Sequence, residues 1–341
     1  MLQLKNSTPL AASMAVLPDR EGVDTLYVVV KATFTFLPAL AVAEEAVPVV
    51  LADEYWGEPE TSSLKRASEL HTGKATTDVI VVGHAWAPRE RSAPTVDVVV
   101  SVAGKRKHVR VFGDRTWRSG GSIGSPQPFQ SIPLVFERAF GGAHRLSDTG
   151  PVLAEEQNPA GVGFLGKRSR SEMAGTRLPN LEDPKHLLER PGDRPPPACL
   201  SFVAPAWLPR RTFAGTYDEA WIKKRAPFLP VDFDPRFFNM AAPELVADRF
   251  LEGNEPLECS GVSRTGPFRI RLAGFRPSIS VTIDGAAERP KPDLETVLVE
   301  PDEARLCLTW RASVGCDKKA LKIKQVEIDA PGLAALEKGS R

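Results

Sequence analysis

Residues 24–37, DTLYVVVKATFTFL, carry the strongest β-strand signal in the chain. From Lys31 to Phe36, polar and apolar residues alternate, so a strand here has one apolar face and one polar face. We therefore expect this strand to belong to a β-rich unit that spans residues 1–118.

Further strand-length runs lie on both sides of a long irregular stretch. They fall at 47–51, 77–85, 95–103 and 107–112, and again at 257–262, 268–272, 278–283, 296–299, 305–310 and 321–328. Between the two groups, Gly and Pro interrupt the chain every few residues; short helices are predicted at 218–225 and at 332–339.

These patterns predict a mainly β fold with few short helices. We expect two antiparallel β-sandwich-like units, an N-terminal one at 1–118 and a C-terminal one at 226–341. A long irregular Gly/Pro-rich central region, residues 119–225, should join them and pack on the N-terminal unit.

The overall charge disfavours some partners. The 44 basic and 43 acidic residues leave a net charge of +1, so no field attracts nucleic acid or an anionic membrane. Apolar runs such as 79–82 are far shorter than the roughly 20 residues that span a bilayer. Residues 1–6 lack a basic leader with an apolar run, and the four cysteines show no C-x-x-C spacing. We expect a cytoplasmic protein with reduced thiols that binds neither nucleic acid nor membrane.

No motif specifies a catalytic, cofactor or metal site. Residues 161–166 match G-x-G-x-x-G, but Asn158 and Pro159 precede them where a strand is required. The histidines are scattered, and no G-x-S-x-G occurs. The most enzyme-like feature is the pair Asp232 and Asp234. On a strand these carboxylates would lie about 7 Å apart on one face and could hold a cation, although flanking prolines favour a turn.

Basic residues gather in two places. One group is Lys105, Arg106, Lys107, Arg110, Arg115 and Arg118, and the other is Lys167, Arg168 and Arg170. Because acidic residues elsewhere offset them, an acidic protein surface is as good a partner for such a patch as a nucleic acid.

A recognisable pattern runs through the centre of the chain. It comprises Gly113-Asp114-Arg115 with Trp117, Pro133-Leu134 with Glu137, Ala139 to Gly142, Asn158-Pro159, Leu178-Pro179-Asn180, Gly215 to Asp218 with Trp221, and Asp232 to Asp234, with Val30 to Phe34 upstream and Trp310-Arg311 downstream. Over residues 2–312 the chain resembles a family of bacterial proteins encoded beside the VgrG spike and PAAR tip genes of type VI secretion systems. The chain departs from the family pattern at Ala75, because a proline commonly follows the lysine that corresponds to Lys74.

The resemblance implies a bacterial, non-enzymatic adaptor or chaperone. Its partners would be a secreted effector protein and the VgrG or PAAR proteins onto which the effector is loaded, and it supplies no catalytic residues and no cofactor. The alternative from the residues alone is a metal-dependent hydrolase or carbohydrate-active protein that uses Asp232 and Asp234.

Two sets of residues are candidates for structural and binding roles. We expect Lys31, Asp114, Arg115, Trp117, Glu137 and Arg138 to form a buried network that holds the irregular region. Removing one charged partner would leave an uncompensated charge, at a cost of about 3–5 kcal/mol. Large aromatic side chains anchor protein interfaces well, and the partner-binding candidates are Phe129, Phe140, Phe164, Trp207 and Trp221.

Overall fold

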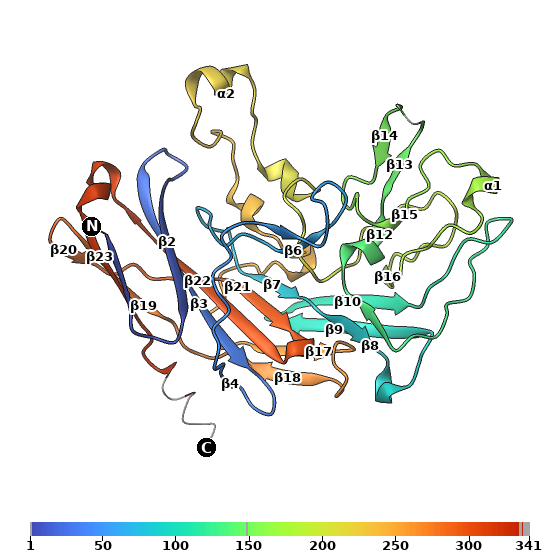
Figure 1. Ribbon diagram of the computed structural model, residues 1–341, viewed down its shortest axis with the longest axis horizontal. Helices are drawn as coiled ribbons and strands as arrows, with labels where there is room; N and C mark the ends of the chain where they lie inside the picture. Colours follow the sequence, from blue (N-terminus) through green and yellow to red (C-terminus); the bar gives the residue numbers. More distant parts are fainter. Residues whose placement is uncertain (1, 148, 334–335, 337–341) are drawn as a thin grey trace.

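The protein is organised around three β-sheets, as seen in a computed structural model that describes residues 2–147, 149–333 and 336 (Figure 1). Strands make up 37% of the structure and helices 11%, which confirms the mainly β fold with few short helices. The helix predicted at 332–339 lies largely outside the described residues.

The largest sheet has six strands in the order β2, β3, β22, β21 and β7, with β4 beside β3. Their bounds are Ala11–Pro18, Asp24–Thr35, Arg305–Gly315, Asp293–Glu300, Asp78–Val81 and Ala41–Val42, respectively. The two longest strands, β3 and β22, pair antiparallel from Thr25 opposite Gly315 to Thr35 opposite Arg305. The pair β21 and β7 is parallel, so this sheet is mixed and not purely antiparallel.

Two smaller sheets complete the core. The five-stranded sheet runs β16 (Leu181–Glu182), β10 (Lys105–Phe112), β9 (Thr95–Val102), β17 (Pro256–Ser260) and β18 (Phe268–Arg271). The four-stranded sheet runs β1 (Gln3–Asn6), β23 (Ile323–Asp329), β19 (Ser278–Ile283) and β20 (Ala286–Glu288), with β1 parallel to β23.

Each of the three sheets combines strands that precede residue 118 with strands that follow residue 225, and the five-stranded sheet also takes β16 from between them. The expected boundaries at 118 and 225 therefore do not separate the sheets, and the first strand after 225 is β17. The longest strand, β3, spans 12 residues and pairs along nearly all of its length with β22, a strand of 11 residues from near the end of the chain. One apolar core continues through all three sheets, with Phe34, Val98 and Ile279 among its buried members.

The remaining elements are short. The paired strands are β5 (Glu54–Tyr55) with β6 (Leu64–Arg66), β8 (His84–Trp86) with β11 (Ser131–Pro133), β12 (Phe140–Gly141) with β15 (Val162–Gly163), and β13 (Ala143–Arg145) with β14 (Val152–Ala154). The α-helices are α1 (Arg170–Met173) and α2 (Glu219–Lys224). The 3₁₀ helices are η1 (Pro88–Glu90), η2 (Phe136–Arg138), η3 (Arg210–Phe213), η4 (Pro235–Phe238), η5 (Pro243–Leu245), η6 (Pro301–Glu303) and η7 (Asp317–Lys322).

The irregular central region has a small core of its own. Buried there are Trp117, Phe140, Met173, Leu178 and Leu188. Because short elements pair few backbone groups, buried side chains of this kind supply much of what holds such a region in one conformation.

Strand β3 is buried on both faces, contrary to a simple division into a core face and a solvent face. The segment that follows β4 crosses its polar face. Lys31 Nζ donates to Glu69 Oε2 at 2.8 Å and to the Pro48 carbonyl at 3.2 Å, and the Val47 amide donates to Thr33 Oγ1 at 2.9 Å. The polar side chains of β3 are therefore covered by the segment that follows β4 and not by water.

Further ion pairs extend this covered face across neighbouring strands. Arg311 Nε on β22 donates to Glu295 Oε2 on β21 at 2.8 Å. Lys74 Nζ lies 2.6 Å from Asp78 Oδ2 on β7, and the Lys74 amide donates to Glu295 Oε1 at 2.7 Å. We call Lys31, Glu69, Lys74, Asp78, Glu295 and Arg311 the buried polar layer. Each of its acids faces a cation, which burial in a low-dielectric interior requires.

We expect Lys31→Met to lower the free energy of unfolding by about 3 kcal/mol, because Glu69 would remain buried without its cation. Urea denaturation at neutral pH measures the change. Lys5→Met is the matched control, since Lys5 pairs with Glu327 at a similar 2.9 Å but on the surface, and it should leave the midpoint unchanged. Equal midpoints for the two variants would contradict a supporting role for the layer.

His71 should make stability depend on pH. Burial, with the positive charges of Arg311 and Lys74 nearby, holds the pKa of His71 well below the ordinary 6.5. The native state thus keeps His71 neutral while the unfolded state takes up a proton below about pH 6.5, so stability is full above that pH and falls with acid. Urea midpoints measured from about pH 7.5 to about pH 5.5 should decline, and less steeply in His71→Asn. A slope unaltered by the substitution would show that other groups cause the decline.

Candidate partner-binding surface

A projection leaves the core between η3 and η4 and carries α2 near its tip (Figure 1). We call residues 214–235 the α2 arm. Its two ends meet at the base, where the Asp234 amide donates to the Phe213 carbonyl at 3.0 Å. The arm is therefore closed at its base and is not an open linker.

A capping residue and the order of charges in the sequence explain why a helix forms at the tip of the arm. Asp218 caps it by accepting from the Trp221 amide at 2.8 Å. Glu219 lies in the first turn and Lys223 in the last, as the helix dipole favours, and the two side chains pair at 3.1 Å. The helix predicted at 218–225 is therefore present, as Glu219–Lys224.

Asp232 and Asp234 hold the base of the arm. Asp232 accepts from the Thr216 amide at 3.0 Å and from Thr216 Oγ1 at 2.8 Å, and these bonds lower the pKa of Asp232 below its usual range. Asp234 pairs with the Arg236 guanidinium at 2.6 Å and caps η4, and the bond to Arg236 lowers the Asp234 pKa. Each carboxylate thus has a partner of its own. Among the described residues, no three acidic, His or Cys side chains come together as metal ligands would.

The arm also leans on the hairpin that joins β2 to β3. Arg20 Nη2 donates to the Val231 carbonyl at 3.2 Å, and the Arg225 guanidinium donates to the Arg20 carbonyl. The ring of Phe228 lies over Gly22, where a Cβ would come within 3.5 Å of it. The arm is therefore fixed at its base and along one side.

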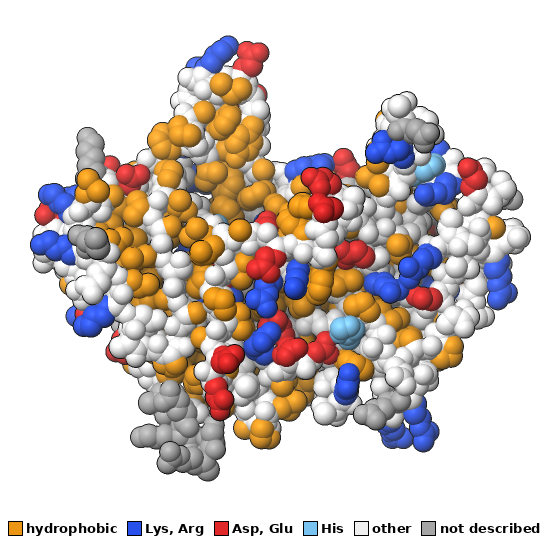
Figure 2. All heavy atoms as spheres, viewed as in Figure 1, with side chains coloured by type: hydrophobic (Ala, Val, Ile, Leu, Met, Phe, Trp, Pro, Cys, Tyr) orange, Lys and Arg blue, Asp and Glu red, His pale blue; other side chains and the backbone are white. Residues whose placement is uncertain are grey.

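Apolar side chains cover much of this projection (Figure 2). The exposed fraction is 74% for Val231, 62% for Ile222 and 53% for Tyr217. Trp221 is partly buried, with Nε1 donating to the Phe228 carbonyl at 2.9 Å and its ring edge-on to Tyr217. Apolar side chains displayed together on a fixed support are typical of a protein-binding surface.

The structure corrects two of the aromatic binding candidates. Phe140 and Trp207 are buried in the core and cannot be first contacts for a partner. Phe129 and Phe164 are partly buried and pack against the main core and the small central core, respectively. Trp221 lies on the α2 arm, where its binding role stays a prediction.

The six residues expected to form one network belong to separate places. Lys31 is in the buried polar layer, Glu137 accepts from the Ser63 amide and hydroxyl, and Trp117 is in the small core. Arg115 pairs with buried Glu182 and stacks on Phe112, whereas Asp114 and Arg138 meet at the surface with Asn180. The prediction of a single network was therefore wrong, because Lys31, Glu137 and Arg115 pair with residues outside the six: Glu69, Ser63 and Glu182.

Sequence reasoning missed the exposed apolar residues of the arm and most of the buried polar layer. Ile222 lies within DEAWIKKR, where an apolar residue among charges was a usable signal. Glu295 and Arg311 sit inside apolar strand sequences, LETVLV and CLTWRASV, which is the signal for a buried ion pair.

The chain matches one family model over residues 21–311, and its description is "Uncharacterized protein conserved in bacteria (DUF2169)". The chain therefore belongs to this bacterial family, whose match covers nearly the same residues as the expected resemblance. Searches of curated proteins and of solved structures gave no match. In the described part of the chain, no helix is long and apolar enough to cross a membrane.

We expect Asp232→Ala to loosen the arm without unfolding the core, because Thr216 loses its acceptor. Chymotrypsin should then cleave at the arm aromatics at least about threefold faster, while the urea midpoint stays unchanged. Asp183→Ala is the control, since Asp183 also accepts a backbone amide, from Lys185 at 2.9 Å, but lies outside the arm. Unchanged cleavage of the arm in Asp232→Ala would show that the base is held by other contacts.

Proposed function

We propose that this member of the DUF2169 family is a non-enzymatic, cytoplasmic adaptor or chaperone. It binds a secreted effector through the α2 arm and helps load that effector onto the VgrG or PAAR proteins of a type VI secretion system. The observation that carries the proposal is the exposure of Tyr217, Ile222 and Val231 on a support fixed to the core. The effector and spike proteins are proposed as partners because the central residues resemble the family encoded beside the VgrG and PAAR genes.

The arm supplies part of the free energy that a partner needs. Burying a side chain of this kind contributes about 1.5–3 kcal/mol, so three contribute roughly 5–9 kcal/mol. Association itself costs about 4–15 kcal/mol, so a stable complex needs further contacts. The bonds of Arg20 to Val231 and of Thr216 to Asp232 already hold the arm in place. They therefore reduce the free-energy cost of ordering the arm when a partner binds.

An adaptor needs partner surface and no reactive group. Asp232 and Asp234, the residues of the enzymatic alternative, are engaged with Thr216 and Arg236. No observation in the described residues favours hydrolase chemistry over this anchoring role. Loading must precede export, which is why the proposal places the protein in the cytoplasm.

We expect the double variant Ile222→Asp, Val231→Asp to abolish effector loading, because charges on the arm must be desolvated against the partner. Binding to an effector encoded beside the spike genes should weaken by at least about tenfold, and its secretion should fall to the level of a deletion strain. Affinity measurements and secretion assays in the same host check this.

The matched control is Leu321→Asp, a fully exposed leucine on η7, which should leave binding and secretion unchanged. Wild-type secretion and affinity in the arm variant would contradict the proposal. Loss of secretion with retained affinity would move the defect from effector binding to docking on the spike.

A further inference from the structure

The five-stranded sheet lies away from the α2 arm (Figure 1). Alternation along β10 turns Lys107, Val109 and Val111 inward and Arg106 outward. Lys107 pairs with Glu244 at 2.9 Å from its buried position, so the basic run predicted at 105–107 is divided between two faces. Arg106 is the member left exposed on the outer face.

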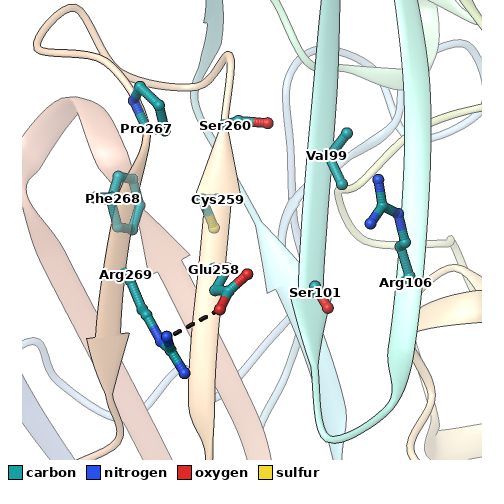
Figure 3. Close-up of a pocket in the computed structure, with 9 residues that line it drawn as sticks. All are labelled: Val99, Ser101, Arg106, Glu258, Cys259, Ser260, Pro267, Phe268 and Arg269. Carbon is teal, nitrogen blue, oxygen red and sulfur yellow. Dashed lines mark ion pairs between the residues drawn. The ribbon is translucent and has the colours of Figure 1, made fainter.

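Strand register places Arg106 in a row with Ser101, Glu258 and Arg269, one residue from each of β10, β9, β17 and β18. A hollow of about 390 Å³ opens over this row, and its side chains are drawn in Figure 3. Phe268 on the edge strand β18 and Ser260 on β17 also line it.

A second hollow, of about 590 Å³, adjoins the first at Pro267. Arg89, Arg264 and Trp86 line it, together with hydroxyl side chains such as Ser263. The Arg264 guanidinium lies 4.1 Å from the centre of the Trp86 ring, so one ring face is already covered. We call the two hollows together the basic groove.

The acids in the basic groove are already engaged. Asp97 accepts from the Arg110 guanidinium at 2.9 Å, and Glu258 pairs with Arg269 at 3.2 Å. The side chains that line the two hollows include four arginines, Arg106, Arg269, Arg89 and Arg264, but two acids, Glu258 and Asp97. The groove therefore has a local excess of positive charge although the chain carries only +1.

We propose that the basic groove binds an acidic segment of a partner protein, at a site separate from the α2 arm. Carboxylates of the segment pair with Arg106 and Arg264, and the serine and threonine hydroxyls of the groove donate to its backbone or side chains. Guanidinium groups suit this role because they stay charged and bind carboxylates in a two-pronged geometry.

The spacing of the groove favours a segment over a single anion. Arg106 lines the first hollow and Arg264 lines the second. Several carboxylates along one chain can pair with both arginines, whereas one small anion would occupy a single hollow.

The groove suits a protein segment better than a nucleic acid. Single-stranded nucleic acids bind by stacking bases on free aromatic faces within a basic track. Here Arg264 covers Trp86, and Phe268 stacks on Phe36 at 4.8 Å. Glu258 and Asp97 would also repel a continuous row of phosphates, but they leave room for spaced carboxylates.

Fluorescence anisotropy with the purified full chain tests this site directly. The probe is a labelled peptide of repeated Glu-Ser-Gly units, with a Gln-Ser-Gly peptide and a single-stranded oligothymidine of equal charge as comparisons. We expect the acidic peptide to bind with a Kd of up to about 1 mM and to bind more weakly as the salt concentration rises. The double variant Arg106→Gln, Arg264→Gln should raise this Kd at least about threefold.

Two control variants separate this inference from the proposed function. Arg145→Gln removes an exposed arginine on β13, outside the groove, and the Ile222→Asp, Val231→Asp protein alters only the arm; both should bind the acidic peptide as the wild type does. Equal binding of the Gln peptide, tighter binding of oligothymidine, or no effect of the groove substitutions would overturn the inference. None of these results depends on the arm or on secretion.

Discussion

The pairing of buried charges around β3 and β22 is the constraint on which the rest of the structure depends. Lys31 and Arg311 lie in the two longest strands, and both reach Glu69, through its carboxylate and its carbonyl respectively. An unpaired charge in such a place costs several kcal/mol, so the covering segment has to be present whenever the sheet is. The same buried ion pairs therefore specify both the strand register of the sheet and the path of the segment that covers it.

This constraint explains why the sequence does not divide into two β units. Lys74 lies early in the chain, but its partners Glu295 and Thr296 lie near its end. Because the buried polar layer takes residues from both halves of the chain, neither half alone can pair all of its buried charges. The α2 arm, by contrast, is fixed by the bond of Asp232 to Thr216 within it and by Arg20 of the β2–β3 hairpin, whereas the central region contributes β16 to the five-stranded sheet.

Local patterns predicted local structure well and long-range pairing poorly. The β3 strand and the α2 helix followed from alternation and from the order of charges, because those signals act within a few residues. Burial of both faces of β3 was not predictable, since the segment that covers it is irregular. Phe140 and Trp207 were misplaced for the same reason: a Gly- and Pro-rich stretch gives no periodicity that separates inward from outward aromatics. Arg106 and Lys107 show how alternation divides a basic run that looks uniform in sequence.

The two surfaces differ in chemistry, and that difference bears on how an adaptor could use them. The α2 arm offers Ile222 and Val231, whose contribution grows with the apolar area buried and changes little with salt. The basic groove offers Arg106 and Arg264, whose contribution is screened by salt and acts at longer range, mainly on the rate of encounter. A partner that is first attracted by charge and a partner that is held by apolar contact need not compete for the same surface. Because the β-sheets join both surfaces to one core, two such partners bound at once would be held at a fixed separation, which is the mechanical requirement for handing one protein to another.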